Sequence, residues 1–160
     1  MITAFTHMLF ILTLFFEAGG ECTKGQEYVA DVITNRSIAI CQESKEYGAC
    51  LEEAMLKQYQ FSCWNERRPS AKEYVNIYMD NPDLVDRLSW MATQHEAHLI
   101  KVLDSVESAD SGGFSLATHY HTKSIQPGWS IADTMIPVAV EGNHIFYKDV
   151  QTLKKMGVIK

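Results

Sequence analysis

The sequence predicts one α+β domain over residues 1–160, mainly helical with a small antiparallel β element. Three observations support this fold class. Several segments in the first two thirds of the chain carry apolar residues at helical spacing, separated by glycine, proline and polar turns. The last third changes to short β-prone runs with turn signals between them. A chain of 160 residues is typical of a single domain that is large enough for a hydrophobic core.

The first predicted helix lies within the stretch from Ala4 to Glu21. Its apolar stripe recurs at three- and four-residue spacing, at Phe5, Met8, Leu9, Leu12 and Phe16. The stripe runs into Glu17, and the following Gly19 and Gly20 are typical of residues just past a helix end. We therefore expect a carboxyl group in the last turn of an apolar helix.

Glu17 stands at an unfavourable position for a charged carboxylate. The C-terminal end of a helix carries partial negative charge, and apolar neighbours also disfavour the ion. Both effects favour the protonated acid, the state that a general acid for glycoside cleavage needs. The helix-end signals by themselves favour a simpler alternative, in which Glu17 is a solvated glutamate at a fraying helix end.

After this helix, the sequence predicts a turn, a loop and four further helices. They are a turn over Cys22 to Gly25, a helix over Gln26 to Arg36, a polar loop over Ser37 to Gly48, a short helix over Cys50 to Leu56, and helices over Ala71 to Met79 and Leu84 to Val106. Between the predicted helices Cys50 to Leu56 and Ala71 to Met79 lies the segment Gln58 to Asn65, which is dense in aromatic and amide side chains. This mixture suits a sugar-binding groove, because ring faces stack on pyranoses and amides pair with hydroxyl and N-acetyl groups. The alternative is an aromatic cluster that pins a loop.

The C-terminal third is predicted to hold two or three short antiparallel strands. Ala117 to His121 alternates in the manner of a strand, and Pro127 to Trp129 forms a turn. Gly142 and Asn143 give a turn signal before the strand-like run from His144 to Tyr147. The tail from Val150 to Lys160 is expected to be a short helix or frayed.

Charge and hydropathy limit the partners. The formal net charge is -6 with no basic stripe, which argues against a nucleic-acid partner. The apolar run from Met8 to Phe16 is too short to span a bilayer, so no stable membrane insertion is expected. Met1 to His7 contains no Lys or Arg, so no convincing signal peptide is present. A weak export or membrane-arrest signal stays an alternative, and cleavage after Gly19 or Gly20 would remove the acid.

The four cysteines are Cys22, Cys41, Cys50 and Cys63, and no CxxC pair occurs among them. This spacing argues against a zinc knuckle or a thioredoxin-type site. Disulfides require an oxidising compartment, and otherwise the cysteines are small core or surface thiols. Proximity in the chain suggests Cys50 with Cys63 as a pair.

Several of these segments, taken in order, resemble one family. The segments FFEAGGE, GQxxVADVITNR, QFSCW, ATHYH, PxW and GNHIFY are similar to those of the SleB-type cell-wall hydrolases, which include spore-cortex lytic enzymes and phage wall hydrolases. The resemblance runs from about Leu14 to Lys148. It implies a lysozyme-like fold, no cofactor, and cleavage of peptidoglycan between N-acetylmuramic acid and N-acetylglucosamine as a lytic transglycosylase.

The resemblance also implies roles and a setting. Glu17 would be the catalytic acid and base, and Glu21 would support it. The other implied supporting or substrate-binding residues are Gln60, Phe61 and Ser62 in a cleft loop, His119, Tyr120 and His121 on a strand, and Asn143, His144 and Tyr147 in a hairpin. Gly19 stands where the family often has Arg, so a basic partner for the acid is missing from the motif. The compact chain shows no separate wall-binding domain, which fits a phage endolysin or a virion-carried lysin acting at the bacterial wall or envelope.

Three alternatives stay open at this point. A muramidase would hydrolyse the same bond with a second carboxylate; Glu21 is a poor candidate for it, and Asp31 on the next helix stays open. His119 and His121 alternate on one strand, and with His144 they could form a catalytic zinc site, although we expect none. A non-catalytic glycan-binding virion module would keep the cleft without requiring the acid.

Overall fold

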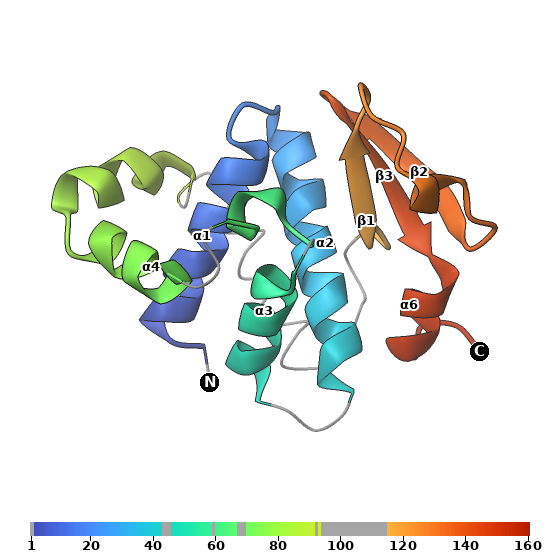
Figure 1. The fold of residues 1–160 in the computed structure, drawn as a ribbon, viewed down its shortest axis with the longest axis horizontal. Coiled ribbons are helices and arrows are strands. Elements are labelled where there is room, and N and C mark those ends of the chain that lie inside the picture. The colour runs from blue at the N-terminus through green and yellow to red at the C-terminus, as the bar shows by residue number, and fades with distance from the viewer. Residues whose placement is uncertain (1, 43–45, 59, 67–69, 92, 94–114) are drawn as a thin grey trace.

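The computed structural model describes residues 2–42, 46–58, 60–66, 70–91, 93 and 115–160. Its elements are α1 (Ala4–Ala18), α2 (Thr23–Cys41), α3 (Tyr47–Leu56), η1 (Ser62–Trp64), α4 (Ala71–Met79), β1 (His119–Thr122), η3 (Gly128–Ile131), β2 (Met135–Glu141), β3 (His144–Asp149) and α6 (Val150–Lys155). The chain is therefore mainly helical with a three-stranded antiparallel sheet, which confirms the predicted α+β class (Figure 1).

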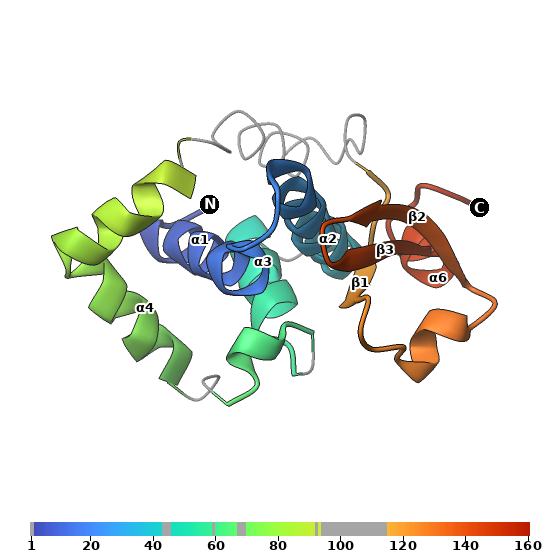
Figure 2. The ribbon, with the colours of Figure 1, turned by 90° about the horizontal axis from the view of Figure 1, so that it is seen from above.

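Helix α1 lies at the centre of the helical part of the molecule. Leu9, Leu12 and Leu14 on it are fully buried, because α2, α3 and α4 pack around it. Viewed from above, α4 and the helical residues 82–91 lie on the side of α1 away from the sheet (Figure 2). Helix α1 ends where predicted: its last residue is Ala18, and the N–H of Gly19 donates to Phe15 O at 2.9 Å. Glu17 therefore lies in the last turn.

Helix α2 is longer at both ends than the sequence predicts. It begins at Thr23 rather than Gln26 and continues through the predicted polar loop to Cys41. The helix continues because most residues from Ser37 to Cys41 are apolar and Ile38 is buried, while the buried Ser37 Oγ donates to Thr34 O at 2.7 Å. The predicted turn over Cys22 to Gly25 and the predicted loop from Ser37 are therefore wrong over these residues.

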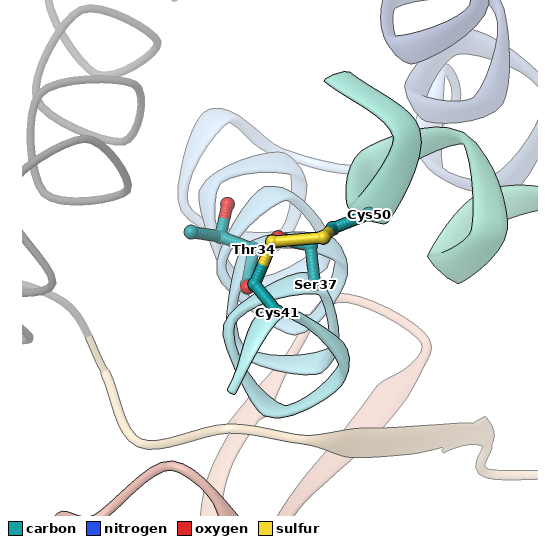
Figure 3. Close-up of a disulfide and its surroundings, with 4 residues drawn as sticks. All are labelled: Thr34, Ser37, Cys41 and Cys50. Carbon is teal, nitrogen blue, oxygen red and sulfur yellow. A yellow bond between two sulfur atoms is a disulfide. The ribbon is translucent and has the colours of Figure 1, made fainter. Parts of the chain in front are cut away.

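A disulfide joins the end of α2 to α3. Cys41 and Cys50 are bonded with their Cα atoms 5.6 Å apart (Figure 3). The suggested pairing of Cys50 with Cys63 is therefore wrong. The extension of α2 brings Cys41 beside α3, whereas Cys63 lies in η1.

The sheet has the order β1-β3-β2, and all neighbouring strands are antiparallel. Tyr120 pairs with Phe146, while His119 pairs with Tyr147 on the opposite face. Phe146 is fully buried and belongs to the same core as α1 and α2. Strand β1 is the edge strand that lies beside α2 (Figure 1). The sheet therefore packs one face on the helices.

Two further predictions concern the ends of the described segments. The tail forms the short helix α6, whose N-cap Asp149 accepts the N–H of Thr152 at 2.9 Å. Of the predicted helix from Leu84 to Val106, residues 84–91 are helical, and most of the remainder lies outside the described residues. Within the described part of the chain, no helix is both long and apolar enough to cross a membrane.

Candidate active site

Glu17 receives three hydrogen bonds at the junction between the helices and the sheet. Ser62 Oγ and the backbone N–H of Cys63 donate to Glu17 Oε1 at 3.1 and 2.8 Å. Tyr120 Oη donates to Glu17 Oε2 at 2.6 Å. The carboxyl group is partly buried, and the donors come from η1 and β1. The side chain is therefore held in one orientation rather than solvated at a fraying helix end.

Buried aromatic rings fix the loop that supplies two of these donors. Phe61 and Trp64 are only 1% and 2% exposed. Trp64 Nε1 donates to Thr13 Oγ1 on α1 at 2.9 Å. These two rings lie beneath the loop, which is the alternative raised from the sequence for this segment. Ser62, by contrast, is exposed beside the acid.

Tyr120 reaches Glu17 because its side chain points from β1 towards the helices. Its ring lies among those of Phe61, His144 and Phe146, with centroids 6.4, 5.0 and 5.6 Å away. Burial, and then the nearby Glu17 carboxylate, raise the pKa of Tyr120 well above its usual range. The phenol therefore stays protonated and acts as a hydrogen-bond donor to Glu17.

Arg36 is a member of the site that the sequence analysis missed. Its Nε donates to Thr118 O at 2.7 Å, and one terminal nitrogen donates to Gln60 O at 3.2 Å. Burial lowers the pKa of Arg36 to about 10, although electrostatic interactions with Tyr120 and Glu17 raise it. The guanidinium is therefore cationic at neutral pH, and it supplies positive charge near Glu17.

A sequence signal for Arg36 does exist. The residue follows the buried apolar positions Val29, Val32 and Ile33 at helical spacing, so it continues the core-facing side of α2. A long cationic side chain on that side needs carbonyl or carboxylate partners. The predicted helix end at Asn35 and Arg36 concealed this pattern.

Glu21 points to the β2–β3 hairpin. Its Oε2 accepts the backbone N–H of Asn143 at 2.9 Å, and its Oε1 lies 3.7 Å from His144 Nδ1. His144 is 5% exposed, and burial lowers its pKa while the carboxylates of Glu21 and Glu17 raise it. Glu21 thus joins the turn after α1 to the hairpin, next to Glu17.

The structure separates the remaining predicted site residues. His119, His121 and Tyr147 lie on the face of the sheet opposite Tyr120, where the rings of His121 and Tyr147 stack with centroids 5.3 Å apart. His121 Nε2 and Tyr147 Oη are hydrogen-bonded at 3.0 Å. His144 shares the face of Tyr120, so the three-histidine zinc site is wrong. No cluster of metal-binding side chains occurs among the residues that the structure describes.

Asp31, which was considered as the second carboxylate of a muramidase, forms hydrogen bonds within the fold. Asp31 is 4% exposed, and its Oδ2 accepts both the N–H and the Oγ–H of Ser115 at 3.1 and 2.6 Å. These bonds hold the segment that leads into β1 against α2. Both carboxylates considered as partners of Glu17 are thus bonded, Asp31 to the segment before β1 and Glu21 to the β2–β3 turn.

Comparison with known families identifies the chain. The family model described as Cell Wall Hydrolase matches residues 20–147, which is most of the sequence. The chain belongs to the cell wall hydrolase family. The matched range of this cell wall hydrolase includes Arg36, Ser62, Cys63 and Tyr120, and it begins three residues after Glu17. No curated protein and no solved structure matches the chain. Family membership makes the protein a peptidoglycan-degrading enzyme that acts on the cell wall.

Proposed function

We propose that this cell wall hydrolase cleaves the glycan strand of peptidoglycan between N-acetylmuramic acid and N-acetylglucosamine as a SleB-type, lysozyme-like lytic transglycosylase. Glu17 is the acid and then the base. The observation that carries the proposal is the set of three hydrogen bonds that Ser62, Cys63 and Tyr120 donate to one partly exposed carboxyl group.

The three donors define how Glu17 performs the first step. Protonated Glu17 transfers its proton to the glycosidic oxygen as the bond breaks through an oxocarbenium-like transition state. The carboxylate that results is stabilised by the Cys63 N–H, by the hydroxyls of Ser62 and Tyr120, and by the charge of Arg36. These groups are already in place before the reaction, so little reorganisation accompanies the proton transfer.

The same carboxylate completes the second step. It accepts the proton of the 6-hydroxyl of muramic acid as this oxygen bonds to the anomeric carbon, which leaves a 1,6-anhydro end. Glu17 recovers its proton, so the reaction needs one carboxyl group. The bonds of Glu21 to Asn143 and of Asp31 to Ser115 favour this route over a muramidase with a second carboxylate.

The decisive experiment is the Glu17→Gln substitution, assayed on purified peptidoglycan. The amide cannot donate the required proton, so cleavage should fall by at least about a thousandfold. The melting temperature should change little, because the amide keeps the shape of the side chain. Glu27→Gln on α2 is the matched control, since Glu27 pairs with Lys24 at the surface, and this variant should cleave like the wild type.

Product analysis distinguishes the competing functions. Mass spectrometry of the muropeptides should find 1,6-anhydro ends. Reducing ends would establish the muramidase instead, and wild-type-like cleavage by Glu17→Gln would refute the role of Glu17. Glycan binding by the wild type without any cleavage would establish a non-catalytic virion module.

The disulfide bears on where this enzyme works. Disulfides such as Cys41–Cys50 form and persist in oxidising compartments, for example the bacterial periplasm. We infer that the chain acts in the cell envelope, as a phage endolysin or a virion-associated lysin.

A further inference from the structure

A pocket of about 470 Å³ lies between α2, α3, β1 and α6. Its volume falls in the range of small-ligand sites. Its polar and charged lining residues include Arg36, Glu53, Lys57, Gln60, His119 and Lys155. Neither Glu17 nor Tyr120 lines it, so the pocket does not contain the acid, although it shares Arg36 with the candidate active site.

Arg36 and Gln60 connect the pocket to the acid. Both residues line the pocket, and Arg36 donates to Gln60 O at 3.2 Å. Gln60 comes directly before the Phe61 to Cys63 segment that supplies two donors to Glu17. The pocket therefore adjoins the segment that holds Glu17 in place.

The pocket lining is polar and carries both signs of charge. Lys57 at the end of α3 and Lys155 at the end of α6 are exposed cations on different walls. Glu53 contributes an anionic side chain from α3. Asp149 already accepts hydrogen bonds from the first turn of α6. A ligand with carboxylates and an ammonium group matches this lining better than a neutral sugar does.

We propose that this pocket binds the peptide stem of peptidoglycan, and this inference rests on the proposed function. The stem leaves the glycan from muramic acid, the sugar at the cleaved bond, so it begins close to Glu17. It carries free carboxylates and, at its diamino acid, an amino group. Lys57 and Lys155 pair with the carboxylates, and Glu53 pairs with the amino group.

The test compares two substrates. Soluble glycan strands with intact stems are cleaved alongside the same strands after an amidase has removed the stems. Lys155→Glu and Lys57→Glu should each lower kcat/KM on the stem-bearing strands by about tenfold, mainly through KM. The loss should be confined to the stem-bearing strands. Lys154→Glu is the matched control, because Lys154 is exposed on the same helix and outside the pocket lining; it should leave both rates unchanged.

A binding measurement separates this inference from the proposed function. A soluble disaccharide–tetrapeptide is titrated into Glu17→Gln, with and without Lys155→Glu, by calorimetry. Binding that weakens about tenfold with Lys155→Glu supports the pocket even if the wild type cleaves neither strand. Unchanged binding, or equal kinetic losses on both substrates, overturns the inference while leaving the role of Glu17 to its own test.

Discussion

The Glu21 carboxylate accepts the backbone N–H of Asn143 at 2.9 Å, across 122 positions of the sequence. This bond joins the turn after α1 to the β2–β3 hairpin. The hydrogen bond between Glu17 and Tyr120 likewise joins the end of α1 to the sheet. The placement of the sheet relative to the acid therefore depends on two carboxyl groups four residues apart.

The approach of Glu21 to the hairpin requires a glycine at position 142. Gly142 has φ +53°, and a Cβ there would overlap Glu21 Oε2. We predict that Gly142→Ala lowers the free energy of unfolding by about 1–3 kcal/mol, measured by urea denaturation. Gly128→Ala is the control, since a Cβ at Gly128 would meet nothing within 4 Å. Equal stability of the two variants would contradict the close contact.

Tyr120→Phe tests the hydrogen bond on Glu17 Oε2. A hydrogen bond to a charged group contributes about 1.5–3 kcal/mol, so kcat should fall by roughly 10- to 100-fold with a small change in KM. The ring remains packed on Phe146, so the thermal midpoint should shift by only a few degrees. Tyr28→Phe removes a hydroxyl from another ring that packs on Phe146. A similar loss of activity in both variants would point to packing as the cause.

Because of His119, we predict that the free energy of unfolding falls in mild acid. Burial, and next the charge of Arg36, lower its pKa from 6.5 to about 4 in the folded chain. The unfolded chain therefore binds more protons between these values, and the free energy of unfolding should fall as the pH drops from about 6.5 to about 4. The expected loss is on the order of 1–2 kcal/mol after allowance for partial exposure.

Urea denaturation over this pH range, with the wild type and His119→Asn, checks the prediction. The slope should flatten in His119→Asn, and His7→Asn, which removes an exposed histidine, is the control. The capping carboxylate Asp149 does not confuse the result. Its pKa lies below its ordinary value of 3.8, because hydrogen bonds outweigh the opposing effect of burial. Its contribution is present above that value and is lost only as the pH falls further. An unchanged slope in His119→Asn would exclude His119 as the cause.

The Cys41–Cys50 disulfide should stabilise the fold more than it affects catalysis. It joins residues separated by nine positions, and closing a loop of this size contributes about 2–3 kcal/mol. Cys41→Ser with Cys50→Ser should lower the free energy of unfolding by this amount, while kcat at 25 °C stays within about twofold, since the disulfide joins α2 to α3 and is not among the groups that bond Glu17. Cys22→Ser, at an exposed cysteine outside the disulfide, is the control for thiol removal. A large loss of kcat in the folded double variant would show that the disulfide positions the site.

The sequence by itself determined the fold class and the place of the acid. Apolar spacing and the glycines after Glu17 predicted α1 and its end, because both signals are local. The Gly142–Asn143 turn signal predicted the hairpin for the same reason. The end of α2 could not be predicted this way. Ser37 has the composition of a loop residue, but in the folded chain its hydroxyl is buried and donates to Thr34 O, and α2 continues to Cys41.

Only the tertiary structure decided which side chains meet Glu17. The alternation of β1 already placed Tyr120 on one face and His119 and His121 on the other, but which of these faces turns towards the helices depends on packing and was decided only in the folded chain. Arg36 and the Cys41–Cys50 pair were hidden in the same way. Their partners lie on other elements, and contacts between distant segments leave little trace in local patterns of hydrophobicity.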